Sequence, residues 1–178
     1  SIREFEERAV SEADVREIVE AARRSASGGN LQPWHLHVLA GDALEALLDR
    51  VAEKSKETPF GDGPEYAIYP ADLSEPYRAR RGKVAEGMYE LLGIARDDVA
   101  GRGAAMAKNF RFFGAPVGML LTIDKQMGPP QFCDLGIFLG NLMLLAREKG
   151  LHSCPQEAWS LWGGTIREVL GLPESELV

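Results

Sequence analysis

The stretch 131-QFCDLGIFLGNLMLLAREKG-150 decides the fold of this chain. Its apolar residues recur at steps of three and four, which is the period of an α-helix. They also spread beyond a single stripe, so the helix should be buried on more than one side, as a central or interface helix is. Gly150 supplies the expected C-terminal cap. The sequence therefore predicts a long central helix from Gln131 to Lys149.

Two segments predict strands against which this helix can pack. Residues 34–39 alternate apolar side chains with His35 and His37, which is the pattern of a strand with one buried face. Residues 117–123 form a continuous apolar run that suits a strand covered on both faces. Residues 176–178 read as the entry to another strand, and we expect the natural chain to continue beyond Val178.

Caps and apolar periodicity predict the remaining helices. Ser11 stands three residues before Asp14 in a capping-box-like spacing, which marks the start of the first helix. Gly171 and Pro173 mark the end of the last one. Residues 58–74 combine proline and glycine breaks with aromatic residues and predict a long ordered loop. The expected helices span residues 12–24, 42–53, 74–92, 97–110 and 161–170.

Composition narrows the class of protein. The 178 residues carry 20 Lys plus Arg against 27 Asp plus Glu, for a formal charge of −7, and 45% of them are hydrophobic. These values predict a single globular domain over residues 1–178, cytoplasmic and without a membrane segment. The acidic balance argues against general binding of nucleic acid. No metal is expected, because His35 and His37 lack a third ligand nearby and Cys133 and Cys154 form no zinc set.

Five motifs follow one another along almost the whole chain. They are S-I-R-x-F at 1–5, N-x-Q-P-W-H at 30–35, F-F-G-A-P-V at 112–117, D-L-G-x-F-x-x-N-L-M-L-L-A at 134–146 and G-L-x-x-C-P-Q-E at 150–157. In this order they resemble the FMN-dependent nitroreductases, also called the nitro/flavin reductase superfamily. The resemblance implies an α+β fold, with a mainly antiparallel sheet flanked by helices. It also implies an intertwined homodimer with FMN at the subunit interface.

The resemblance places the FMN-binding residues in three segments of the chain. The N-terminal segment and the 155–158 segment would bind the flavin of one subunit, and the turn after the first helix would reach it from the partner subunit. The matching residues are Ser1, Arg3, Ser25, Ala26, Ser27, Gly28, Asn30, Pro155, Gln156, Glu157 and Ala158. Ala26 stands where the family often has proline, and Ala158 where glycine is common. The family's C-terminal Arg or Lys phosphate ligands should lie beyond Val178.

Two of these residues carry the expected catalytic roles. A reduced flavin bears negative charge at N1–C2=O, so the Arg3 guanidinium placed near those atoms would stabilise the reduced ring and ease hydride uptake. The resemblance implies that the backbone N–H of Glu157 lies near flavin N5 and orients it. We expect a ping-pong cycle in which NADPH or NADH reduces FMN and leaves before a small, flat, electron-poor acceptor binds to the same ring face.

Several residues keep alternative interpretations. Tyr66, Tyr69 and Phe113 are candidates for an acceptor pocket, because flat substrates stack on aromatic faces, although Phe113 equally suits a core position before the strand. Ser25 and Ser27 could simply cap the first helix. The basic run Arg78, Arg80 and Arg81 fits a solvated helix face, or recognition of flavin or of the NADP 2′-phosphate.

The reaction itself has alternatives within the same superfamily. Nitroaromatic or quinone-like acceptors are our first expectation. A flavin reductase, an ene-type reductase and a reductive dehalogenase would share the same flavin cradle and differ in the acceptor pocket. A non-catalytic flavin-binding protein is the alternative from another class.

Overall fold

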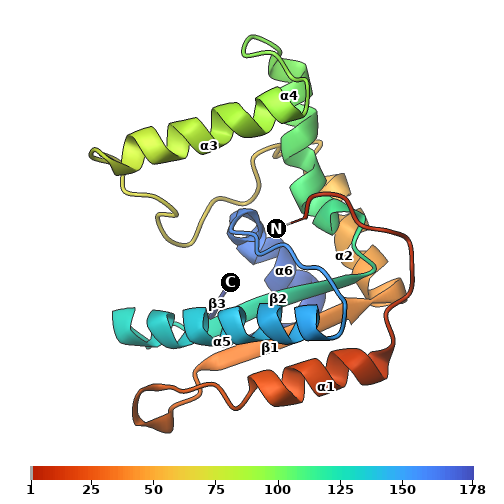
Figure 1. Ribbon diagram of the computed structural model, residues 1–178, viewed down its shortest axis with the longest axis vertical. Coiled ribbons are helices and arrows are strands. Elements are labelled where there is room, and N and C mark those ends of the chain that lie inside the picture. The colour runs from red at the N-terminus through yellow and green to blue at the C-terminus, as the bar shows by residue number, and fades with distance from the viewer. Residues whose placement is uncertain (1) are drawn as a thin grey trace.

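The computed structural model describes residues 2–178, and in them six α-helices surround one three-stranded antiparallel sheet (Figure 1). The strand order is β1-β2-β3, so each strand lies beside its neighbour in sequence. Trp34 of β1 lies opposite Ile123 of β2, and Ala40 opposite Val117. The predicted antiparallel α+β fold is confirmed. The strands are β1 Trp34–Ala40, β2 Val117–Asp124 and β3 Glu176–Leu177.

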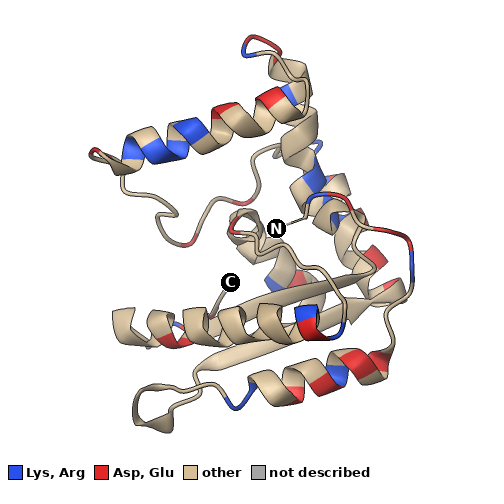
Figure 2. Ribbon diagram, viewed as in Figure 1, with Lys and Arg blue, Asp and Glu red and all other residues tan. Residues whose placement is uncertain are grey.

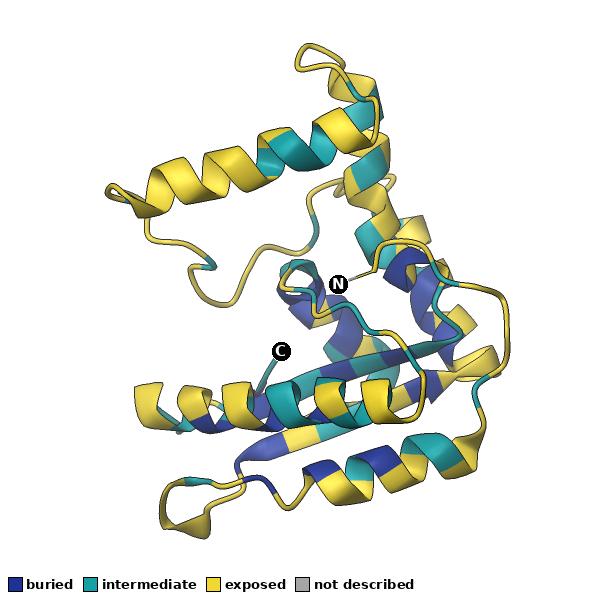
Figure 3. Cartoon of the chain, viewed as in Figure 1, coloured by how far each residue is buried: buried dark blue, intermediate teal, exposed yellow. Residues whose placement is uncertain are grey.

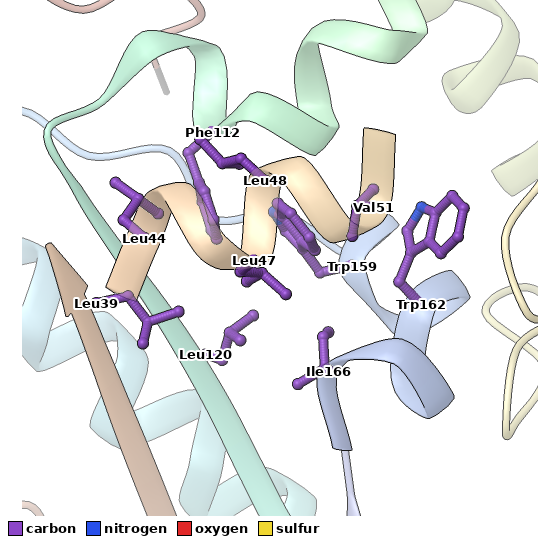
Figure 4. Close-up of a cluster of buried hydrophobic side chains, with 10 residues drawn as sticks. All are labelled: Leu39, Leu44, Leu47, Leu48, Val51, Phe112, Leu120, Trp159, Trp162 and Ile166. Atoms are coloured by element: carbon purple, nitrogen blue, oxygen red, sulfur yellow. The ribbon is translucent and has the colours of Figure 1, made fainter. Parts of the chain in front are cut away.

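Strand β2 is covered on both faces, as its unbroken apolar run predicts. Leu120 faces one core, which it shares with Leu47 and Ile166 (Figure 4). Met119 and Leu121 face the other core. Helices α2 and α6 cover the first face, and α1 and α5 cover the second. These helices are α1 Glu12–Ala22, α2 Gly41–Lys54, α5 Pro129–Glu148 and α6 Gly163–Leu170.

Helix α5 occupies the central position that its sequence predicts. Phe138 is fully buried and stacks on Trp34 of β1, with ring centroids 5.0 Å apart. Beyond the helix, Gly150 takes a φ of 75° and closes the C-terminal turn, as expected. The opposite side of the helix is open, because Ile137 is 44% and Leu144 70% exposed (Figure 3). That face is apolar and has no cover within this chain.

Helices α3 and α4 project from the rest of the molecule (Figure 1). No residue of either helix is buried, and most of α3 is exposed (Figure 3). The basic residues gather near the start of α3 (Figure 2). The chain from 58 to 74 contains no helix or strand, which confirms the predicted loop. The two helices are α3 Tyr77–Leu91 and α4 Val99–Ala107.

The predicted helix over 97–110 is wrong at its C-terminal end. Helix α4 stops at Ala107, and a 3-10 segment follows over Lys108–Gly114. Phe112 and Phe113 take φ values of 45° and 54°, outside the helical range. The reason is tertiary, because Phe112 leaves the helix to stack on Trp159 at 4.3 Å inside the core (Figure 4).

The last predicted helix also begins later than expected. A 3-10 segment over Ala158–Trp162 precedes α6, which starts at Gly163. Trp159 and Trp162 are both buried in the core that contains α2 (Figure 4). Residues 161–162 therefore follow the packing of two tryptophans and not the helical period.

A polar cluster lies on the sheet face that α6 covers. The Glu176 carboxylate accepts a hydrogen bond from the Thr122 hydroxyl. It also lies 3.1 Å from His35 Nδ1 and 3.2 Å from His37 Nε2. Burial alone would raise the pKa of Glu176, but the hydrogen bonds from Thr122, His37 and His35 outweigh it and lower that pKa. The two histidines are thus packed strand residues paired with a carboxylate.

This cluster predicts acid sensitivity of the fold. Because folding lowers the Glu176 pKa below its usual value of 4.5, the carboxylate stabilises the protein above that pH. The contribution is lost as the pH falls through the folded pKa. We expect the wild type to be more stable than Glu176→Gln at pH 7, and the gap to shrink in acid. Urea unfolding at several pH values measures it.

Glu174→Gln is the matched control, because the Glu174 side chain is 90% exposed. Its stability should follow that of the wild type at every pH. A gap between wild type and Glu176→Gln that did not change with pH would contradict the expected role of the Glu176 carboxylate.

The search for a membrane span is limited to the described residues. Within that part of the chain, no helix combines the length and apolar character that crossing a bilayer requires.

Candidate functional site

A cavity of about 720 Å³ opens between α5, β2 and residues 150–160. Its inner wall is apolar and includes Leu121 of β2 and Leu139 of α5. Pro155, Gln156 and Glu157 lie at its other side, together with the N-terminal segment. The volume falls within the roughly 300–1,000 Å³ of typical small-molecule sites. The cavity therefore has an apolar wall on one side and two of the motif segments, the N-terminal one and residues 150–157, on the other.

The N-terminal segment runs beside residues 153–157. The Ile2 N–H donates to the Ser153 carbonyl at 3.3 Å, and the Phe5 N–H donates to the Phe113 carbonyl at 3.2 Å. Ile2 and Glu4 line the cavity, whereas Arg3 between them does not. Among residues 2–178, no carboxylate lies within 4.0 Å of the Arg3 guanidinium. Arg3 thus carries an exposed charge one residue from the contact with Ser153.

Residue 157 is held at its carbonyl. The Ser160 N–H and the Ser160 hydroxyl donate to the Glu157 carbonyl at 3.1 and 2.7 Å, which starts the 3-10 turn. The Gln156 amide is tied to Asn109, whose carbonyl oxygen it meets at 3.0 Å. No acceptor in the described chain takes the Glu157 N–H. This backbone donor is therefore available to a ligand.

The loop over 58–74 reaches the same residue through Tyr69. Its hydroxyl donates to the Glu157 carboxylate at 2.7 Å. The Arg81 guanidinium lies 4.0 Å from the centre of the Tyr69 ring. The hydrogen bond to Glu157, followed by burial, raises the pKa of Tyr69, so the phenol stays protonated at neutral pH. Burial likewise raises the pKa of Tyr66, which lines the cavity.

The start of this loop is fastened to α6. The Asp62 carboxylate accepts hydrogen bonds from the Thr165 N–H at 2.6 Å and from the Thr165 hydroxyl at 2.8 Å. Glu65 pairs with Arg167 at 2.7 Å. These contacts fix the start of the loop to α6, and the bond from Tyr69 to Glu157 fixes the loop further along the chain. Tyr66 lies between these two attachment points.

The turn after α1 forms a second group. The Ser25 hydroxyl donates to the Ala22 carbonyl at 2.6 Å and accepts from Asn141 at 2.8 Å. The Gly28 N–H donates to the Asp134 carboxylate at 3.1 Å. Ser25 therefore does cap α1, while α5 holds the turn from the other side.

The two groups lie apart within one chain. In Figure 1 the 25–30 turn follows the end of α1, on the far side of α5 from residues 153–158. The structure thus brings the N-terminal segment, residues 153–157 and the loop tyrosines together, and leaves the 25–30 turn separate. Ser1, which the resemblance assigns to flavin binding, lies outside the described residues.

Comparison with known proteins decides the family. The model of the Nitroreductase family matches residues 1–178. The chain belongs to the nitroreductase family. It is 37% identical over 164 residues to the chloronitrobenzene nitroreductase of Comamonas testosteroni. The matched stretch covers 92% of this chain and 72% of that relative. It is 36% identical over 176 residues to the nitrobenzene nitroreductase of Ectopseudomonas oleovorans, covering 99% and 78%.

Solved structures of nitroreductases share the fold. The FMN and NADPH-dependent nitroreductase NfnB from Sphigopyxis sp. strain HMH matches with a TM-score of 0.96 and 47% identity, over 99% of this chain and 79% of that one. The FMN-dependent NfnB from Mycobacterium smegmatis, in complex with NADPH, matches with a TM-score of 0.92 and 28% identity, over 99% and 78%. The family resemblance drawn from the five motifs is confirmed.

Sequence reasoning missed two polar residues of α5 that hold the 25–28 turn. Asp134 and Asn141 belong to the quoted helix motif but had been assigned no role. They stand seven residues apart on α5, hence on one helix face, and both hold the 25–28 turn. Asp134 is 7% exposed and its Oδ2 has no partner in the described chain. Two polar residues spaced by two turns in an otherwise apolar helix were the signal.

The aromatic residues divide differently from the sequence expectation. Phe113 is buried and does not line the cavity, which favours its alternative role in the core. Its neighbour Phe112, the other aromatic ring of the F-F-G-A-P-V motif and likewise a candidate for the acceptor pocket, does line the cavity. Because Phe112 and Phe113 follow each other at positive φ, the turn and not the strand period decides which ring faces the cavity.

Proposed function

We propose that this chain is an FMN-dependent nitroreductase, which takes electrons from NADPH or NADH and reduces nitroaromatic or quinone-like acceptors. The observation that carries the proposal is the Glu157 N–H, which no acceptor in the described chain takes, in a residue that lines a cavity with an apolar wall. The N-terminal segment and Tyr66 line the same cavity, and Tyr69 bonds to the Glu157 carboxylate. The relatives named for chloronitrobenzene and nitrobenzene support the reaction. We also propose that the protein is cytoplasmic, as its composition predicts.

The residues of this site fit FMN. A flat ring needs an apolar surface, a donor for its ring nitrogen and a cation near its carbonyls. The cavity wall, the unpaired Glu157 amide and the unpaired Arg3 guanidinium offer these groups within adjoining segments. When bound, FMN supplies a ring that accepts a hydride from a nicotinamide and passes it to an acceptor.

The chain's own residues would bind the flavin ring, orient it and exclude water from it. The Glu157 N–H would fix the position of the ring nitrogen, and Arg3 would balance negative charge at the pyrimidine edge. The bond to Asn109 fixes the Gln156 side chain, and Pro155, Gln156, Glu157 and Ala158 would meet the ring through their backbone. Tyr66 and Tyr69 would flank the acceptor. Donor and acceptor would use the same space in turn, which makes the kinetics ping-pong.

We infer that the active form is a homodimer of this domain, 1–178. Within one chain the 25–30 turn lies away from residues 153–158, so Ser25, Ala26, Ser27, Gly28 and Asn30 cannot complete the same site. A second copy packed on the open face of α5 would bring its own turn to that site. The exposed Ile137 and Leu144 support this, since such apolar residues favour an interface.

The visible spectrum of the purified protein tests the function. We expect reconstitution with FMN to give a yellow protein that anaerobic NADPH bleaches and that nitrobenzene reoxidises. A colourless protein that takes up no FMN would refute the flavin site. Bleaching without nitro reduction across a panel of nitroaromatics and quinones would favour a flavin reductase, an ene-type reductase or a dehalogenase. FMN binding without bleaching by NADPH or NADH would indicate a non-catalytic flavoprotein.

Arg3→Ala tests the electrostatic role. Loss of a charge-assisted contact should weaken FMN binding roughly tenfold and slow reduction by NADPH. Titration of FMN and stopped-flow bleaching measure the two effects. Arg16→Ala, which removes an exposed guanidinium paired with Glu12 on α1, should change neither. An Arg3→Ala protein equal to wild type would make Arg3 an ordinary surface residue.

Leu144→Lys tests the dimer. An ammonium group on the open face of α5 should prevent association, because a charge without a partner is costly in an interface. We expect light scattering to show a dimeric wild type and a monomeric variant that no longer retains FMN. Leu91→Lys, on the 90% exposed Leu91 of α3, should remain dimeric. A monomeric wild type that binds FMN would overturn the dimer.

A further inference from the structure

Three side chains connect α3 to the turn that carries the free Glu157 amide. Arg81 of α3 lies 4.0 Å from the centre of the Tyr69 ring, and the Tyr69 hydroxyl donates to the Glu157 carboxylate at 2.7 Å. The loop is otherwise tied down at Asp62 and Glu65, through Thr165 and Arg167 of α6. Tyr69 is therefore the point at which the far half of the loop reaches the site.

The contact between Tyr69 and Glu157 is specific among the tyrosines of the described chain. Tyr89 has the same kind of neighbour, because the Arg102 guanidinium lies 4.2 Å from the centre of its ring. The Arg80 guanidinium lies 5.9 Å from the centre of the Tyr77 ring. Neither of these two hydroxyls donates to a carboxylate within the hydrogen bonds of residues 2–178. An arginine over a tyrosine ring thus recurs, while the bond to an acid distinguishes Tyr69.

The bond from Tyr69 helps to hold residue 157 in place. Its carbonyl is held by Ser160, and its carboxylate is held by Tyr69. With these two groups held, the backbone N–H is the polar group of residue 157 that no acceptor in the described chain takes. A donor whose direction is fixed before the ligand binds costs no reorganisation when charge moves, which is the condition for electrostatic stabilisation.

The same bond also moderates charge. A free carboxylate beside a ring that takes up electrons would oppose the added negative charge. The Tyr69 hydroxyl donates to that carboxylate, and the Arg81 cation lies behind the ring of Tyr69. Both effects work in the direction of easier reduction.

We propose that Tyr69, supported by Arg81, is a positioning residue that fixes Glu157 for flavin reduction, in addition to flanking the acceptor. The inference rests on the proposed function, because it assigns a role toward the FMN of that site. It links α3 and the 58–74 loop to the limiting rate of the first half-reaction, whereas a residue that only lines the space shared by donor and acceptor would change the apparent affinity for NADPH or for the acceptor.

The experiment compares Tyr69→Phe with its matched control Tyr89→Phe in the FMN-loaded protein. We expect Tyr69→Phe to retain FMN with the wild-type dissociation constant, and to lower the limiting rate of bleaching at saturating NADPH roughly three- to tenfold. The apparent dissociation constant for NADPH should stay unchanged. Tyr89→Phe should match the wild type in all three measurements.

A double-mutant cycle isolates the bond itself. Glu157→Ala keeps the backbone N–H of residue 157 and removes the carboxylate that accepts from the Tyr69 hydroxyl. If the two side chains act together, Tyr69→Phe should slow the Glu157→Ala protein less than it slows the wild type. Arg81→Ala should give a smaller fall in the same rate, and Arg81→Lys should restore part of it.

The outcomes separate this inference from the function on which it rests. A wild type that binds no FMN, or that NADPH does not bleach, removes the function. A wild type that bleaches normally while Tyr69→Phe bleaches at the same rate overturns the inference alone. So does a Tyr69→Phe protein that is altered only in the KM for the nitroaromatic acceptor, or one whose effect is additive with that of Glu157→Ala.

Discussion

The packing of α5 against the sheet is the constraint on which the rest of this structure depends. Phe138 and Trp34 stack at its centre, and the apolar residues of the helix form one wall of the large cavity. From another part of the same helix, Asp134 and Asn141 hold the 25–28 turn. One helix therefore forms a wall of the cavity and also sets the position of the 25–28 turn.

The two faces of α5 also explain why a single copy looks incomplete. The buried face stabilises the fold of one subunit, while the open face presents Ile137 and Leu144 to solvent. Exposing large apolar side chains loses the free energy that their burial would contribute. A second copy on that face would bury them and would supply the turn that one chain cannot bring to residues 153–158.

The site region combines a fixed core with a fastened loop. Phe112 turns into the core at positive φ, where its stacking on Trp159 offsets the cost of that backbone conformation. From the other side, Asp62 and Tyr69 tie the 58–74 loop to α6 and to Glu157. Helices α3 and α4 have no buried residue, and the contact of Arg81 with Tyr69 links α3 to the loop at the site.

Local pattern predicted the central helix, the two longer strands and the long loop, and the five motifs predicted the family and, through it, the antiparallel sheet. Helical period, alternation and caps depend on neighbours in the chain, and the five motifs are read directly. The tertiary structure decided which side chains meet. Tyr69 and Glu157 stand 88 residues apart, and Gly28 and Asp134 stand 106 apart. Contacts over such separations follow from how packed elements are placed, as do the early end of α4 and the inward turn of Phe112, and no local period encodes them.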